Sequence, residues 1–250
     1  MHQRYKNELH PLVRKMESIV DLTSEERDGL LSLPMMVRRV GADQDIVRDG
    51  DRPSQSCLLL EGMLFRYKLA GEDRRQILAF HIAGEIPDLQ SLYIRTMDHS
   101  LAAVTDSKVG FIQHEALYRL VAEFPRLAGA FWRETLIDAA IFREWMVGMG
   151  RRKAPSRIAH FLCEMYVRLD SIGMAENWTV TLPITQEEVG DSLGLSAVHT
   201  NRALQELRGQ DLIVFERGKL TILDWRGLVQ VGEFDPTYLH LDPKSTEHAA

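Results

Sequence analysis

A change of pattern near residue 113 constrains the fold of this chain more than any other feature. From Met35 to Ile112 the sequence breaks into short apolar runs, separated by Gly, Asp and Pro clusters such as RDGDRP and AGEDRR. Frequent turns between short apolar runs are typical of antiparallel sandwiches and barrels, and GMLFRYKLAGEDRRQILAFHIAGE reads as a hairpin with Gly71 in its loop. We therefore expect an α+β fold whose first domain, residues 1–124, is an antiparallel β-roll with short helices in its first thirty residues.

From His114 onward the pattern becomes helical. HEALYRLVAEFP indicates one helix that Pro125 stops, and RLAGAFWRETLIDAAIFREWMVGMGRR indicates a second, longer one. Apolar or small residues recur along the long helix at steps of three and four, and a second set widens the apolar surface. The first set is Ala128, Phe131, Thr135, Ala139, Phe142, Met146 and Met149, and the second is Trp132, Leu136, Ile141 and Trp145. We expect residues 125–150 to form a dimerisation helix, one face on the roll and the other on a partner; a simple core helix is the alternative.

The next segment, MGRRKAPSR, reads as a hinge, with Gly148, Gly150 and Pro155 around the basic run Arg151 to Lys153. A helix with an apolar face follows in SRIAHFLCEMYVRLDSIG. We expect a separate domain over residues 151–232 and a flexible acidic tail over residues 233–250.

The segment from Ile184 to Ile213, ITQEEVGDSLGLSAVHTNRALQELRGQDLI, carries the most specific local signals. Thr185 and Glu188 form the Thr-x-x-Glu capping box, so a helix should begin near Gln186. Gly194 can adopt the left-handed conformation that ends this helix, and Ser196 then caps a second helix over residues 197–208. Two short helices joined by a glycine turn are typical of the helix-turn-helix, whose second helix enters the DNA major groove.

The outward face of the second helix fits base recognition better than a generic helical hairpin would require. Small side chains allow close approach to the bases, Arg pairs with guanine, and Asn or Gln pairs with adenine. The candidate DNA-binding residues on the second helix are Ala197, Val198, His199, Asn201, Arg202 and Gln205. Behind it, DLIVFERGKLTILD reads as a hairpin that could serve as a wing, with Arg217 and Lys219 as candidate contacts to the DNA backbone.

Charge and cysteine content restrict the remaining possibilities. The net charge of -6 disfavours nucleic-acid binding over the whole surface, although it allows a local basic face. Cys57 and Cys163 are far apart and outside any CxxC, so we expect buried, reduced thiols and no metal site built on cysteine. The sequence begins without a secretory-signal pattern and has no run near the roughly 20 apolar residues that span a bilayer, so we expect a cytoplasmic protein with no membrane partner.

Two other classes of function remain open at this stage. An enzyme with a regulatory β-roll is one, but the sequence contains no nucleotide-binding glycine loop, no G-x-S-x-G and no HExxH. A β-roll interaction protein whose helix-turn-helix binds a protein partner is the other. We expect a non-enzymatic protein that binds double-stranded DNA.

The order of these parts resembles the Crp/Fnr family of bacterial transcription regulators over about Leu30 to Leu223. The matching segments are SRIAHFLCEM, LPITQEEVGDSLGLSAVHTNRALQELRGQDLI and, more weakly, GEIPDL. The resemblance implies a cyclic-nucleotide-binding-like β-roll, a homodimer on a two-fold-symmetric operator, and an interaction with RNA polymerase.

By the same resemblance, Arg202 matches the position that most often pairs with guanine. Val198 stands where members that read guanine-rich half-sites usually have Glu, and Ala197 stands where cAMP-responsive members have Arg. These two departures predict a different operator. The positions that contact phosphates in the family are matched by Thr185, Gln186, Ser196 and His199, although His199 could instead reach a base.

The candidate effector pocket departs further from the cAMP-binding pattern. Gly84 and Glu85 match the Gly-Glu pair that holds the ribose, but Met97 stands at the position of the phosphate-binding Arg. The remaining candidate pocket residues are Asp98 and His99 beside Met97, and Phe142 and Arg143 at the positions of the hydroxyl residues that reach the adenine. Since Asp98 would repel an anion, we predict weak cAMP binding or none. No cofactor is identified and the effector is unknown; His81 and His99 could ligate haem, but isolated histidines are more often ordinary polar residues.

Overall fold

The computed structural model describes residues 10–71 and 74–242. Residue contacts divide the chain into two compact units, Met1–Lys68 with Leu78–Asp138 and Leu69–Ile77 with Ala139–Ala250. The boundary falls within the long helix α5 (Pro125–Arg151), so the first half of this helix belongs to the first unit and its second half to the second.

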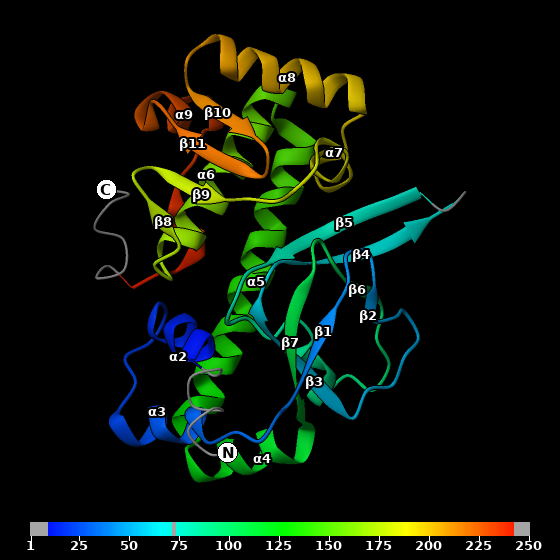
Figure 1. The fold of residues 1–250 in the computed structure, drawn as a ribbon, viewed down its shortest axis with the longest axis vertical. Coiled ribbons are helices and arrows are strands. Elements are labelled where there is room, and N and C mark those ends of the chain that lie inside the picture. Colours follow the sequence, from blue (N-terminus) through cyan, green and yellow to red (C-terminus); the bar gives the residue numbers. More distant parts are fainter. Residues whose placement is uncertain (1–9, 72–73, 243–250) are drawn as a thin grey trace. The chain divides into compact units, whose positions relative to one another are not determined.

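Two antiparallel sheets build the first unit (Figure 1). One has the order β1 (Met36–Val40), β7 (Ser107–Gln113), β3 (Gln55–Glu61), and the other has the order β2 (Asp45–Val47), β6 (Ser100–Ala103), β4 (Leu64–Ala70), β5 (Arg74–His81). The predicted hairpin is confirmed, since β4 and β5 are neighbours in the second sheet and Gly71 follows β4 directly.

Apolar side chains from both sheets meet in one core, which stabilises the roll by removing apolar surface from water. The core residues are Val40, Val47, Cys57, Leu59, Leu64, Met97, Leu101, Ala103 and Val109. The predicted antiparallel β-roll is therefore present.

Short helices accompany the sheets in the first unit. These are α2 (His10–Glu17), α3 (Ser24–Leu31), the 3-10 helix η1 (Leu89–Leu92) and α4 (His114–Glu123). Thr23 and Glu26 form a reciprocal capping box at the start of α3. Pro125 follows α4 and opens α5, where the missing N–H of proline costs no intrahelical hydrogen bond.

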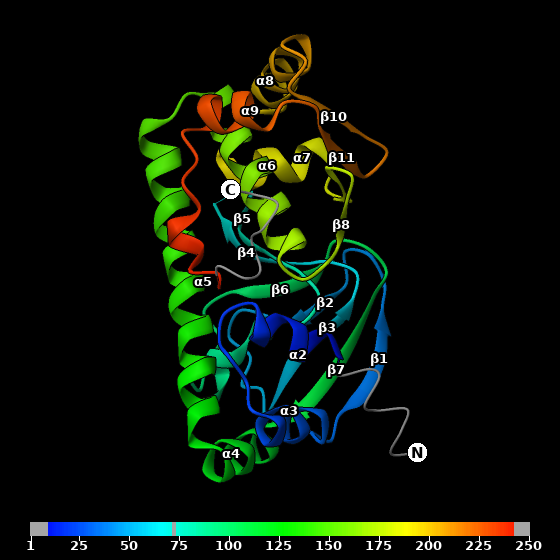
Figure 2. The same ribbon diagram turned by 90° about the vertical axis from the view of Figure 1, so that its left-hand side faces the viewer.

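Figure 2 shows α5 as one long continuous helix. Its buried and exposed faces differ in detail from the two sets that the spacing predicts. Each predicted set contains both buried and exposed residues. In the first set Phe131 is buried while Phe142 and Met146 are exposed. In the second set Ile141 and Trp145 are buried while Trp132 and Leu136 are exposed. Two apolar faces do exist. The exposed one contains Trp132, Leu136, Phe142, Met146 and Met149, and the inward one contains Leu127, Ala130, Phe131, Ile137, Ile141 and Trp145.

The second unit is built around α6 (Ala154–Asp170), which contacts three shorter helices: α7 (Gln186–Leu193), α8 (Ala197–Gly209) and α9 (Trp225–Gly232). A small antiparallel sheet has the order β10 (Ile213–Glu216), β11 (Lys219–Ile222), β9 (Thr179–Thr181), β8 (Ala175–Glu176). Figure 1 shows β10 and β11 as the hairpin that the sequence predicts after α8.

The structure corrects the prediction of a flexible tail from Glu233 over the described part of that segment. Residues Pro236–Leu239 form the 3-10 helix η2, and Leu239 is buried. The hydroxyl of Tyr238 donates to Glu164 Oε2 at 2.8 Å, and its ring stacks on His160. Acidic composition suggested solvation, but the buried Leu239 side chain and the hydrogen bond from Tyr238 to Glu164 hold the segment. Residues 243–250 lie outside the described part.

Helix α9 was not predicted from the sequence, because only eight residues separate the wing from Glu233. Among the described helices, none is long and apolar enough to cross a membrane.

Candidate nucleic-acid interface and sensory site

Local sequence signals place the start of α7. The Glu188 amide N–H donates to Thr185 Oγ1 at 3.1 Å, and the Thr185 N–H donates to Glu188 Oε2 at 2.7 Å. Both halves of the predicted capping box are therefore present, and α7 begins at Gln186 as expected. This satisfies two backbone donors that a helix start otherwise leaves unpaired.

The turn between α7 and α8 depends on close approach. Gly194 adopts φ 64° and ψ 40°, the left-handed conformation that the sequence predicts there. A Cβ at Gly190 would lie 2.8 Å from the Leu195 carbonyl oxygen and 3.1 Å from Thr200 Oγ1, so the small residue lets the second helix approach the first. The carbonyl of Leu193 accepts a hydrogen bond from Arg157 of α6, a contact that the sequence reasoning missed.

The second helix presents the face that was predicted for base recognition. Ser196 Oγ accepts from the His199 N–H and also contacts His199 Nδ1 at 2.9 Å, which confirms the N-cap. All the candidate residues of α8 are exposed, with Val198 at 75%. Leu204 and Leu207 are fully buried on the opposite side. Asn201 Nδ2 donates to Gln186 Oε1 at 3.3 Å, which connects this face to the start of α7.

The hairpin behind α8 has the tight turn of a wing. Arg217 has φ 51° and Gly218 has φ 71°, and Glu216 is paired with Lys219 across the turn. Positive φ at both central residues matches the twist of the strands they join. Arg217 and Lys219 are exposed at this tip.

The basic run between α5 and α6 contributes less charge than its composition suggested. Arg152 pairs with Glu144 at 2.6 Å and is mostly buried, so it is neutralised within the second unit. Arg151 and Lys153 are exposed.

Comparison with known proteins supports the same interpretation of both units. The cyclic nucleotide-binding domain family matches residues 37–124, and the Crp-like helix-turn-helix domain family matches residues 156–231. The chain is a Crp/Fnr-family transcription regulator.

Curated relatives and solved structures agree with this assignment. The regulator is 29% identical to the nitrogen fixation regulation protein FixK of Bradyrhizobium diazoefficiens, over 66% of this chain and 69% of that protein. It is 24% identical to the transcriptional activator protein Anr of Pseudomonas protegens, over 82% of this chain and 84% of that protein. The structure of FixK2 from Bradyrhizobium japonicum superposes with a TM-score of 0.72 at 24% identity, covering 80% of this chain and 98% of that chain.

The Gly-Glu pair of the regulator's β-roll lies in a buried cluster of charges. Glu85 Oε1 is 3.2 Å from Lys15 Nζ on α2, and Glu85 Oε2 is 3.0 Å from His81 Nδ1. Lys15 Nζ is also 3.4 Å from Glu134 Oε1 on α5. Burial lowers the pKa of His81, and burial raises the pKa of Glu134 against the opposing effect of Lys15. Sequence reasoning found Glu85 but not Lys15, because only the fold brings α2 to this turn.

A second, partly buried ion pair adjoins the turn that follows Glu85. Arg66 Nη1 is 2.6 Å from Asp138 Oδ2 on α5, and Arg66 Nη2 donates to the Pro87 carbonyl at 2.6 Å. Burial opposes ionisation of Asp138, but Arg66 and the other neighbours hold its pKa below the usual value.

The other candidate pocket residues lie in two separate segments of the chain. Met97 is buried in the apolar core of the roll. His99 Nδ1 is 2.7 Å from Asp98 Oδ1, and its Nε2 contacts the Gln90 side chain at 3.2 Å. Phe142 and Arg143 belong to the second unit, where both are exposed. The effector pocket expected from family positions stays a prediction.

No group of three His, Cys, Asp or Glu side chains with the arrangement of a metal site occurs among residues 10–71 and 74–242. Cys57 and Cys163 are buried and free, as predicted. Burial raises the pKa of both thiols, and therefore keeps them in the unreactive protonated form. The backbone N–H of Cys57 donates to buried Asp88 at 2.8 Å.

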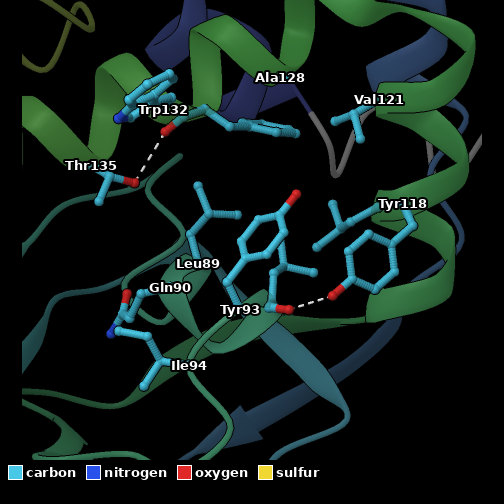
Figure 3. A pocket seen from close by; sticks show the side chains of 12 residues that line it. Leu89, Gln90, Tyr93, Ile94, Tyr118, Val121, Ala128, Trp132 and Thr135 are labelled. Carbon is cyan, nitrogen blue, oxygen red and sulfur yellow. Dashed lines mark hydrogen bonds between the residues drawn. The ribbon is translucent and has the colours of Figure 1, made fainter.

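An apolar pocket of about 430 Å³ opens between η1, α4 and α5 (Figure 3). Tyr93 and Trp132 border it, and they are 79% and 69% exposed. The Tyr118 hydroxyl donates to the Leu92 carbonyl at its edge. Sequence reasoning did not find this pocket, since its walls come from three separate segments.

Proposed function

We propose that the regulator binds a two-fold-symmetric DNA operator as a homodimer and that its effector is not cAMP. The observation that carries the DNA-binding half is the exposed face of α8, where Asn201, Arg202 and Gln205 project without a carboxylate before Glu206. Arg, Asn and Gln are the side chains that pair with guanine and adenine edges in the major groove. Each subunit then places α8 in one of two successive major grooves.

Phosphate contacts would hold this helix in register. Thr185, Gln186, Ser196 and His199 are exposed around the first turns of α7 and α8, and Arg217 and Lys219 are exposed on the wing. Such contacts add affinity that depends on salt but not on sequence.

The homodimer is proposed from the exposed face of α5. Four large apolar side chains on this helix are well exposed: Trp132 at 69%, Leu136 at 54%, Met146 at 57% and Phe142 at 41%. Exposed apolar surface on a helix marks an interaction site. The pocket beside Trp132 continues this surface, and a second copy would cover both because a two-fold interface uses the same patch on each subunit.

Further parts of the proposal follow from the family. Regulators of this kind act on RNA polymerase bound nearby, and bacterial DNA lies in the cytoplasm, so we place the protein and its partners there. The proposal includes no enzymatic role, since the curated relatives that this chain resembles are named as transcriptional activator and regulation proteins.

Selection of bound duplexes from a random pool tests the proposal directly. We expect purified full-length protein to enrich a two-fold-symmetric site whose half-sites are one helical turn apart, with an affinity that falls steeply as salt rises. Selection is run with and without a cell-extract fraction that could supply the effector. Failure to enrich any symmetric site under either condition contradicts the proposal and favours a protein-binding role for the helix-turn-helix.

A further inference from the structure

The Gly84–Glu85 turn is covered by the chain's own N-terminal helix. Gly84 has φ 95°, and a Cβ there would lie 2.3 Å from the Pro11 carbonyl oxygen and 2.7 Å from Lys15 Cβ. The backbone of α2 is therefore in direct contact with the turn. Leu12, Val13 and Met16 of the same helix are buried, which anchors α2 in this place.

Both carboxylate oxygens of Glu85 have partners within the protein. Oε1 faces the Lys15 ammonium at 3.2 Å, while Oε2 faces His81 Nδ1 at 3.0 Å and the Ile82 N–H at 3.4 Å. The side chains of Lys15 and Glu85 are 5% and 6% exposed. A ligand hydroxyl would have to displace one of these partners to reach the carboxylate.

Lys15 also balances the charge of its surroundings. Glu85 and Glu134 are two buried carboxylates on either side of one ammonium, and Glu134 Oε2 is buried without a hydrogen-bond partner among the described residues. Without Lys15, like charges would remain in a largely buried site, and such unpaired buried charges are strongly destabilising. The ion pairs of Lys15 with Glu85 and Glu134 are thus required to keep α2 closed over the Gly84–Glu85 turn.

We propose that Lys15 takes the place of an effector at Glu85: its ammonium pairs with the Glu85 carboxylate and closes the Gly84–Glu85 turn. Helix α2 must therefore move before an external molecule can reach Glu85. Lys15 thereby excludes ligands that would bind through the Glu85 carboxylate. The inference deepens the effector half of the proposed function. Its test involves no DNA, so it can fail while the DNA-binding proposal stands.

The test is hydrogen exchange on the full-length protein with matched variants. Lys15→Met keeps the side-chain length but removes the charge, Lys15→Arg keeps the charge, and Arg14→Met removes the same charge from the neighbouring exposed position of α2. In Lys15→Met we expect exchange of residues 10–17 and of the 82–86 turn to rise at least about tenfold, with α4 unchanged, since local opening sets these rates. Lys15→Arg and Arg14→Met should stay within about twofold of the parent protein.

Two further measurements make the outcome decisive. Adding Glu134→Gln to Lys15→Met removes one of the two like charges and should restore slow exchange in both segments. If Lys15→Met does not fold, recovery of a folded protein by the same double variant supports the proposal, and failure to recover overturns it. Exchange in Lys15→Met that matches Arg14→Met overturns it, as does saturable micromolar cAMP binding by the unmodified protein in calorimetry.

Discussion

Arg157 Nη1 donates a 2.6 Å hydrogen bond to the carbonyl oxygen of Leu193, the last residue of α7. The other terminal nitrogen, Nη2, donates to the carbonyls of Met149 at 3.0 Å and Arg152 at 3.1 Å. One guanidinium therefore joins the ends of α5 and α7 to the start of α6. Its positive charge also lies at the C-terminus of α7, where the helix dipole favours a cation.

Replacing Arg157 is expected to disturb the position of α7 and α8 without removing any DNA contact. Hydrogen bonds to a charged group contribute about 1.5–3 kcal/mol, so Arg157→Met should lower operator affinity by about tenfold or more. The operator affinity of Arg157→Lys should lie between those of Arg157→Met and the parent protein, because one ammonium cannot reach three carbonyls with the geometry of a planar fork. Fluorescence anisotropy with the selected operator measures both, and equal affinity of Arg157→Met and the parent protein would show that the contact does not position the helices.

Arg202 is predicted to read a base. Arg202→Ala should weaken binding to the selected operator by about 1–3 kcal/mol, roughly 5- to 150-fold, and relax the preference at one position of each half-site. Binding to random duplex should change much less. Arg226→Ala, which removes an exposed arginine from α9, is the matched control. A loss that is the same on operator and random duplex would assign Arg202 to the phosphate backbone instead.

Arg217 is predicted to contact phosphate through the wing. Since its φ of 51° is unfavourable for a side chain with a Cβ, Arg217→Gly should leave the hairpin folded while removing the charge. We expect affinity to fall by a similar factor on every sequence and the slope of log affinity against log salt to decrease by about 1. A salt titration of the variant against the parent checks this; an unchanged slope would place the wing away from the DNA.

Trp132 is predicted to lie in the subunit interface. Trp132→Glu places a charge on the exposed apolar face of α5 and should shift the protein toward monomer, with at least about a tenfold weaker dimer, because burying an unpaired charge costs several kcal/mol. Arg119→Glu, at an exposed position of α4, is the control and should remain dimeric. Sedimentation velocity over a range of concentrations separates the outcomes, and a parent protein that is monomeric throughout would refute the homodimer.

Asp88 is predicted to make stability depend on pH. Burial raises its pKa from 3.8 to about 7, although the Cys57 N–H and the Arg66 charge act in the opposite direction. Because the folded pKa lies above the unfolded one, the folded protein retains this proton between pH 3.8 and about 7, and the free energy of unfolding falls as pH rises through that window, by at most about 4 kcal/mol.

Asp88→Asn removes this titration while keeping an oxygen that accepts from Cys57. Urea unfolding should therefore show the variant gaining stability relative to the parent as pH rises from 5 to 8. Asp28→Asn on the exposed side of α3 is the control and should show no such trend. A difference between Asp88→Asn and the parent that does not vary with pH would mean that Asp88 is ionised in the folded protein throughout this range.

Much of the helix-turn-helix could be predicted from the sequence because its signals are local. The Thr185–Glu188 capping box, the left-handed Gly194 and the Ser196 cap each involve residues within three positions of one another, and each is present as predicted. The spacing of Leu204 and Leu207 fixed the inward face of α8, and so also its outward face. The candidate base-reading residues follow from that face alone.

Predictions that depended on distant partners were less accurate. Spacing placed Phe131 in the same set as Phe142 and Met146, but Phe131 is buried and the other two are exposed, because burial depends on which distant segments pack against the helix. The segment after Glu233 looked like a solvated tail, because composition cannot show that Tyr238 reaches Glu164 or that Leu239 finds an apolar site.

The sequence by itself therefore determined the β-roll, the long helix and the helix-turn-helix in their order, and the outward face of α8, because periodicity and capping act over one or two helical turns. Tertiary structure decided which charges meet. Lys15 and Glu85 are seventy residues apart, Arg157 and Leu193 are separated by all of β8 and β9, and no local pattern links either pair. Their pairing follows from the close packing of a helix against a glycine turn and of a guanidinium against a helix end, and both contacts exist only once the chain has folded.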